Sequence, residues 1–124
     1  MFGYNECESA RDAAYNYEGT EHESHFSHEL IAGAAAFAGM KAFEDHQRSE
    51  GKQVSHQFAK ELLAGFAGAE VDKLAETKGL DFIDREKAKH HSKKQAEHLY
   101  EQQYGGYDDY NPNDMEPHPT MRQY

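Results

Sequence analysis

The sequence predicts an all-α fold, a small helical bundle built on a repeated helix, with flexible acidic tails. Three observations support this prediction. Apolar residues recur at spacings of three and four along two long stretches, no Pro occurs before residue 112, and a shift of 32 residues superposes one stretch on the other. The 124 residues suffice for one domain with one modest core.

The first predicted helix covers roughly residues 21–49. Thr20 and Glu23 have the spacing of a capping box, and helix-forming residues then run without Pro to Gly51. Its apolar positions are Phe26, Leu30, Gly33, Phe37 and Met40. Their spacing places them on one helical face, which another element has to cover.

A second helix is predicted to begin after an N-cap at Ser55 and to end at Lys78, before Gly79. Its apolar positions repeat the spacing of the first helix: Phe58, Leu62, Gly65 and Ala69. A third helix is predicted from Asp81 to about Tyr104. The two similar helices are expected to be antiparallel, with the third completing the bundle.

The internal repeat is the strongest organisational signal. Eight of nineteen positions match across the shift of 32 residues: Phe26 and Phe58, Glu29 and Glu61, Leu30 and Leu62, Ala32 and Ala64, Gly33 and Gly65, Ala35 and Ala67, Lys41 and Lys73, Glu44 and Glu76. Such a period indicates one helical unit used twice, each copy covering the apolar stripe of the other. Chance similarity between two Ala-rich helices is the alternative.

The ends of the chain differ in composition from its middle. Residues 1–26 hold six acids and one arginine, residues 104–124 hold four acids and one arginine, and all eight tyrosines lie near the ends. We therefore divide the chain into a flexible N-terminal segment (1–19), a helical domain (20–104) and a disordered acidic C-terminal tail (105–124) that contributes nothing to a core.

Small residues run through both similar helices. The candidate packing positions are Ala32, Gly33, Ala35, Gly39, Ala64, Gly65 and Gly68. Each interior Gly costs about 0.5–1 kcal/mol relative to Ala, so these positions indicate close approach to the backbone. Tight packing within the chain, self-association into a homo-oligomer such as a dimer, and a flat cofactor on the stripe are the three interpretations.

Histidines are the candidate metal ligands. His22, His25 and His28 follow one another at i, i+3 spacing, and two of them could share a divalent metal on a helix. His28 and His46 bracket the small-residue stripe, an arrangement that a haem plane could use. The alternative is that these are solvated or packing histidines, and the Glu-x-x-His and His-Glu-x-x-His signatures are both absent.

Other functions receive little support from the sequence. The net charge of -10 disfavours nucleic acid, and the basic residues of the third helix have acidic neighbours at i, i+3 and i, i+4. No nucleophile elbow or phosphate-binding loop occurs, which favours a non-enzymatic role without a cofactor but does not exclude an enzyme. With a single cysteine, no membrane span and no leader peptide, we expect a cytoplasmic protein.

Four stretches carry a resemblance to a known family. These are Ser27–Phe37 with Phe43–Arg48, Val54–Glu61, and Ala69–Lys89. Over roughly residues 25–104 the chain resembles the fungal CipC-like family, the concanamycin-induced or antibiotic-response proteins. The resemblance implies a small intracellular fungal protein whose abundance rises under antibiotic or related stress. It implies no catalytic residues or ligand set.

Overall fold

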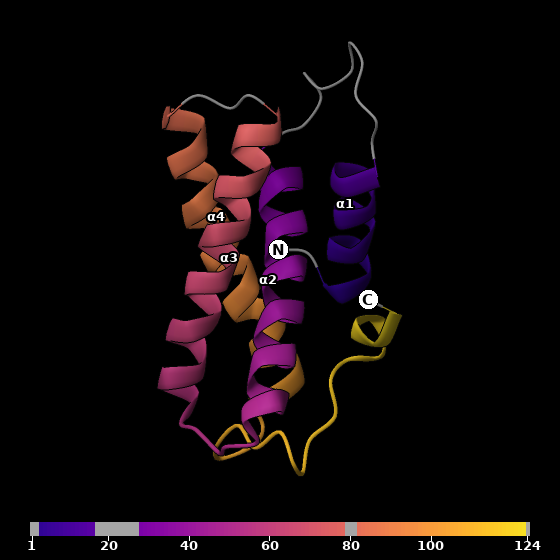
Figure 1. Cartoon of the computed structure of the whole chain (residues 1–124), viewed down its shortest axis with the longest axis vertical. Coiled ribbons are helices and arrows are strands. Elements are labelled where there is room, and N and C mark those ends of the chain that lie inside the picture. Colours follow the sequence, from indigo (N-terminus) through magenta and orange to yellow (C-terminus); the bar gives the residue numbers. More distant parts are fainter. Residues whose placement is uncertain (1–2, 17–27, 79–81, 124) are drawn as a thin grey trace.

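The computed structural model describes residues 3–16, 28–78 and 82–123. Within these ranges the chain forms four α-helices, α1 (Tyr4–Asn16), α2 (His28–Glu50), α3 (His56–Lys78) and α4 (Phe82–Tyr104), and one 3-10 helix, η2 (Pro119–Gln123). Successive α-helices run up and down alternately (Figure 1). The predicted all-α bundle is confirmed.

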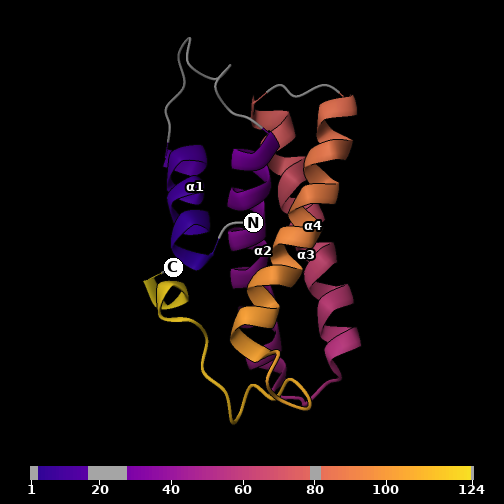
Figure 2. The ribbon, with the colours of Figure 1, turned by 180° about the vertical axis from the view of Figure 1, so that it is seen from behind.

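Helix α2 is the centre of the bundle. It packs against α1, α3 and α4, and α3 also packs against α4. Helix α1 lies on the side of α2 remote from α3, as the front and back views both show (Figures 1 and 2). Helix α3 packs against α2 and α4, and no helix of the described chain packs against the side of α3 that faces away from α2.

Local sequence signals explain where the helices begin and end. The Ser55 hydroxyl accepts a hydrogen bond from the Phe58 N–H at 3.1 Å, which caps the N-terminus of α3 as predicted. Gly51 follows α2 with a φ of 67°, and its N–H bonds to the Gln47 carbonyl at 2.9 Å. Gly is favoured at such a left-handed position because it has no Cβ.

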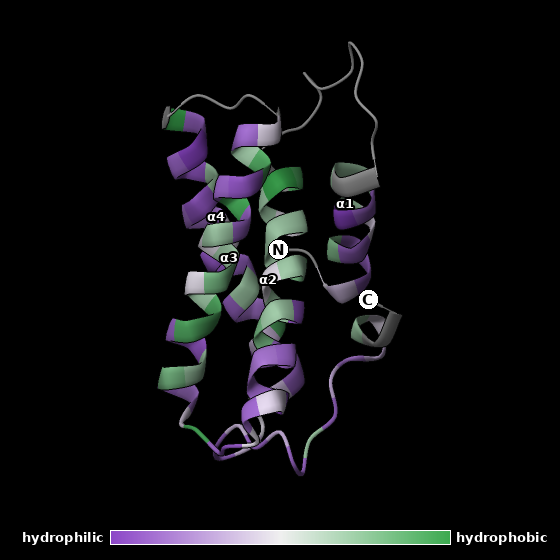
Figure 3. Ribbon diagram, in the orientation of Figure 1, coloured by the Kyte–Doolittle hydropathy of each residue, from purple (hydrophilic) through white to green (hydrophobic). Residues whose placement is uncertain are grey.

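The core has two parts along the bundle. One part contains the aromatic side chains of α2, α4 and the C-terminal segment (residues 105–123), including Phe37, Phe43, Tyr100, Tyr104 and Tyr110, all fully buried. The other lies near the start of α2 and consists mostly of small and aliphatic side chains. Hydropathy colouring shows α4 as largely hydrophilic, so this helix contributes a narrow apolar face (Figure 3).

The buried face of α3 differs from the one predicted. Ala59, Leu63, Ala67 and Val71 are fully buried, whereas Phe58 is 51% exposed and Gly65 and Ala69 are also exposed. The expectation that Phe58, Gly65 and Ala69 face the first helix is therefore wrong. Helix α3 has two neighbouring apolar stripes, and spacing alone does not decide which one packs inward.

Both ends of the described chain contribute buried side chains to the core. Tyr4, Cys7, Ala10 and Ala14 of α1 are buried at helical spacing. Tyr110 and Met121 of the C-terminal segment are buried too, which corrects the expectation that residues 105–124 add nothing to the core. Tyrosine and methionine supply the apolar surface that aliphatic residues do not. The division of the chain at residues 19 and 104 stays a prediction.

Candidate functional site

Of the three histidines in the predicted cluster, only His28 lies within the described residues. His22 and His25 lie outside the described residues, and His28 is the first residue of α2, with a side chain that is not described. Among the residues that the structure does describe, no group of three or more His, Cys, Asp or Glu side chains could hold a metal ion. The metal and haem alternatives therefore gain no support.

The small residues of α2 are buried against other parts of the protein. Ala32 and Ala35 are buried, as are Gly33 and Gly39. A Cβ on Gly39 would lie 2.7 Å from the Cα of Ala67, so α2 and α3 pack backbone to backbone at this point. His46 is exposed, and its ring contacts Phe66 with centroids 5.7 Å apart.

The corresponding positions of α3 have different environments. Gly68 is buried, and its Cβ position would lie 3.4 Å from the Lys93 side chain. Ala64 is half-buried and lines a shallow groove between α3 and α4. Gly65 is exposed, with no heavy atom within 4 Å of its Cβ position. The repeat therefore places Gly33 and Gly65 in different environments, although the matched Ala35 and Ala67 are both buried.

A polar cluster lies inside the aromatic part of the core. Glu44 is 2% exposed and accepts hydrogen bonds from the hydroxyl groups of Tyr104 and Tyr110, the latter at 2.6 Å. Arg48 Nη2 lies 3.3 Å from the Glu44 carboxylate. Burial raises the pKa of Glu44, and the hydrogen bonds from Tyr104, Tyr110 and Arg48 oppose this rise without cancelling it. Burial likewise raises the pKa of both tyrosines, which keeps them protonated as donors.

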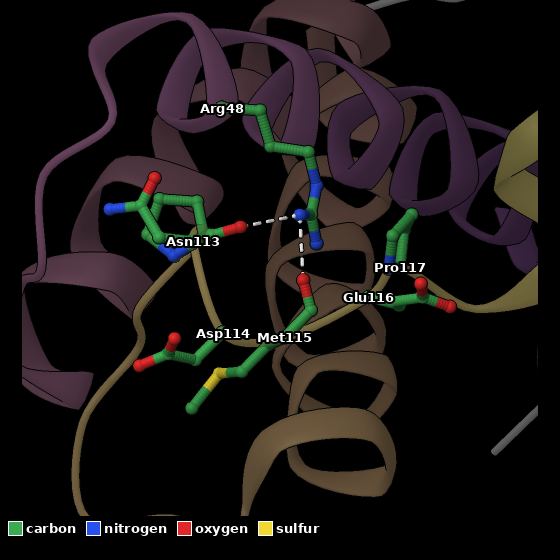
Figure 4. Close-up of a pocket in the computed structure, with 7 residues that line it drawn as sticks. Arg48, Asn113, Asp114, Met115, Glu116 and Pro117 are labelled. Atoms are coloured by element: carbon green, nitrogen blue, oxygen red, sulfur yellow. Dashed lines mark hydrogen bonds between the residues drawn. The ribbon is translucent and has the colours of Figure 1, made fainter.

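Arg48 connects this cluster to the C-terminal segment. Its Nη1 donates to the Pro112 carbonyl at 2.9 Å and to the Met115 carbonyl at 2.7 Å (Figure 4). The open cleft around it is lined by Arg48 and by residues 112–117. Because the guanidinium is already engaged by two carbonyls, Glu44 and the Tyr104 hydroxyl, we assign this cluster to holding the C-terminal segment in place.

His56 forms a second attachment for the same segment. Its Nε2 lies 2.6 Å from the Tyr107 carbonyl, and its Nδ1 lies 2.5 Å from the Tyr100 hydroxyl. A carbonyl accepts only, so Nε2 carries the proton and Nδ1 accepts from the Tyr100 O–H in the neutral ring. Val54 and Tyr110 add a pair of backbone hydrogen bonds of 2.9 Å each.

The single cysteine is not placed for nucleophilic chemistry. Cys7 is fully buried in α1. Burial, with a smaller contribution from Glu6, raises the pKa of its thiol to about 12, which disfavours the reactive thiolate.

The most distinctive surface feature is the outer face of α3, which we define as Phe58, Glu61, Leu62, Gly65, Ala69 and Lys73. Its members share one side of the helix, facing away from α2, and all are exposed except the half-buried Leu62. Sequence reasoning found the apolar members of this face but assigned them to the core.

Over the residues that the structure describes, the fold is an up-and-down bundle of four α-helices, closed at one end by a hydrogen-bonded C-terminal segment. The chain belongs to the family described as "Virulence factor CipC-like", whose model matches residues 10–103. The resemblance seen in the sequence is thereby confirmed. No curated protein and no solved structure matches the chain. None of the described helices is long and apolar enough to cross a membrane.

Proposed function

We propose that the protein acts by association with another protein through the outer face of α3, and not by catalysis. The observation that carries this proposal is the exposure of Phe58, at 51%, in line with Leu62, Gly65 and Ala69. Contiguous apolar surface on a small protein is characteristic of an interaction site. An exposed aromatic side chain is also the type of residue that contributes most to binding when a partner buries it.

Charge supports association with a protein and not with a polyanion. The chain has a net charge of -10, which repels nucleic acid, while the outer face of α3 carries one acid, Glu61, and one base, Lys73. A face that has apolar residues between an acid and a base is complementary to a protein helix that also carries apolar residues and charges of both signs.

Site-specific photocrosslinking tests this proposal. The photoreactive residue benzoylphenylalanine replaces Phe58 in the full chain, produced in its native cells. Ile83 on α4, which is 64% exposed, provides a matched control position. We expect a discrete protein adduct from position 58 and none from position 83. Equal labelling at the two positions, or none at position 58, would contradict the proposal.

Family membership supports a cellular setting for this association. We infer a cytoplasmic fungal protein that becomes abundant under antibiotic or related stress. The description of the family as virulence-related is consistent with a protein made in response to a hostile environment. Immunoblotting of cell fractions before and after antibiotic exposure tests this inference. A constant amount of protein, or its recovery outside the cytosolic fraction, would contradict it.

A further inference from the structure

The outer face of α3 contains a ridge of four residues with opposite charges at its two ends. Glu61, Gly65, Ala69 and Lys73 follow one another at intervals of four residues, and all four are exposed. Residues at i and i+4 are neighbours on a helix and form the ridges through which helices most commonly pack. The ridge has two small residues at its centre, an acid at one end and a base at the other.

We propose that a second copy of this chain occupies this face, with its α3 antiparallel to the first. This inference rests on the proposed association function and names the partner. A two-fold axis at position 67 sets Gly65 against Ala69 of the second copy. The same axis sets Glu61 against Lys73 of the second copy, and each pairing occurs twice.

Charge decides the orientation of the two helices. In a parallel two-fold pair every residue faces its own equivalent, so Glu61 would face Glu61 and Lys73 would face Lys73. In the antiparallel pair both ends of the ridge bring opposite charges together. Lys73 is available for such a contact, because its side chain is 71% exposed and its ion pair with Glu70 is long, at 3.5 Å.

The chain already uses the same device internally. Gly39 of α2 packs against Ala67 of α3, where the absent Cβ lets the two backbones meet. Gly65 and Ala69 present the same two residue types on the opposite side of α3, and the space next to Gly65 is empty of protein atoms to 4 Å. Helix α1 covers the outer side of α2, and the second copy covers the outer side of α3.

Apolar burial adds to the fit of the second copy. Phe58 and Leu62 lie beside the ridge, toward the start of α3. In a two-fold pair, the second copy covers Phe58 and Leu62 of the first copy, and the first copy covers the same two residues of the second. Buried apolar area is the main favourable term in such an association.

Charge reversal tests the orientation. The dissociation constant of the dimer is measured by sedimentation velocity for the full chain and for Glu61→Lys, Lys73→Glu and the double variant. Each single reversal replaces two attractive pairs with two repulsive ones, so we expect its dissociation constant to rise about tenfold. The double variant restores opposite charges, and we expect its constant to return to within about threefold of the wild-type constant.

Gly65→Leu separates assembly from folding. The new side chain meets no atom within the chain, so we expect the unfolding midpoint of the monomer to stay the same or rise. At the crossing point it would hold the two helices apart, so we expect a rise in the dissociation constant of at least a hundredfold. Lys87→Glu, on the exposed side of α4, is the control and should leave the constant unchanged.

Three outcomes would overturn the antiparallel dimer: a wild-type chain that stays monomeric at all concentrations, single reversals without effect, or a double variant weaker than both singles. The crosslinking experiment distinguishes the two proposals. A monomeric chain that still gives an adduct from position 58 with another protein overturns the second copy and supports association. A monomeric chain that gives no adduct overturns both.

Discussion

Gly39→Ala offers the sharpest test of the packing between α2 and α3. The added Cβ would lie 2.7 Å from the Cα and 2.8 Å from the N of Ala67, both atoms of the backbone. No side-chain rotation relieves this contact, so one helix has to move. Overpacking of this kind costs about 1–3 kcal/mol, while the gain in helix propensity from Gly to Ala is about 0.5–1 kcal/mol. We expect a net loss of about 1–2 kcal/mol in the free energy of unfolding.

Gly65→Ala is the matched control on the neighbouring helix. Its Cβ meets nothing within 4 Å, so only the propensity term remains, and we expect a gain of about 0.5–1 kcal/mol. For a chain of this size about 1 kcal/mol corresponds to roughly 4 °C in Tm, so the two variants should shift Tm in opposite directions. Both are measured by thermal unfolding followed by circular dichroism, at a concentration where the chain is monomeric. A Gly39→Ala variant as stable as Gly65→Ala would refute the close approach.

Three further predictions concern the C-terminal segment. Tyr110→Phe removes a hydrogen-bond donor from the buried Glu44, so we expect a loss of about 1–3 kcal/mol in urea unfolding, and no loss would contradict that hydrogen bond. Burial raises the pKa of Glu44 in the folded state above its unfolded value of about 4.5, so between these two pKa values the folded state binds more protons than the unfolded state. The stability that Glu44 contributes therefore falls as the pH rises from about 4.5 through the folded pKa. The stability of the wild type relative to Glu44→Gln should therefore decrease over that interval in urea titrations at each pH, and a difference that grows with pH would show the opposite sign. His56→Ala removes both attachments to Tyr100 and Tyr107, so hydrogen exchange in residues 105–111 should accelerate while the exchange of α2 stays slow. Unchanged exchange in that loop would mean that His56 does not hold it.

Much of the helical framework could be predicted from local signals. The N-cap at Ser55 and Gly79 gave bounds for the second predicted helix that agree with α3, and the third predicted helix, from Asp81 to about Tyr104, agrees with α4. These signals act between residues three or four apart, so they can be read without knowing the tertiary structure. The capping box at Thr20 and Glu23 lies outside the described residues.

The choice between two apolar stripes could not be predicted in the same way. Helix α3 places Ala59 and Leu63 inward and Phe58 outward, although Phe58 is the largest of the three. This orientation brings Ala67 against Gly39 of α2, a close approach between residues far apart in the sequence that local spacing does not reveal. A repeat predicts that two helices are similar, but not that they bury the same face.

The polar cluster was missed for a related reason. Glu44 lies among buried residues of α2, and its partners Tyr104 and Tyr110 are 60 and 66 residues away. The concentration of tyrosines near the ends of the chain was the only available signal. It indicated that the ends differ in composition, and it gave no indication that their hydroxyl groups meet one carboxylate.

The long separation between Glu44 and its donors has a consequence for synthesis of the chain. When α2 and α3 leave the ribosome, the two hydroxyl groups that satisfy this carboxylate have not yet been made. The aromatic part of the core is incomplete until the segment after α4 emerges, because Tyr110 and Met121 belong to it. Nascent chains of this protein should therefore reach their native packing only after the segment that contains Tyr110 and Met121 has emerged, and would depend until then on protection of their exposed apolar surface.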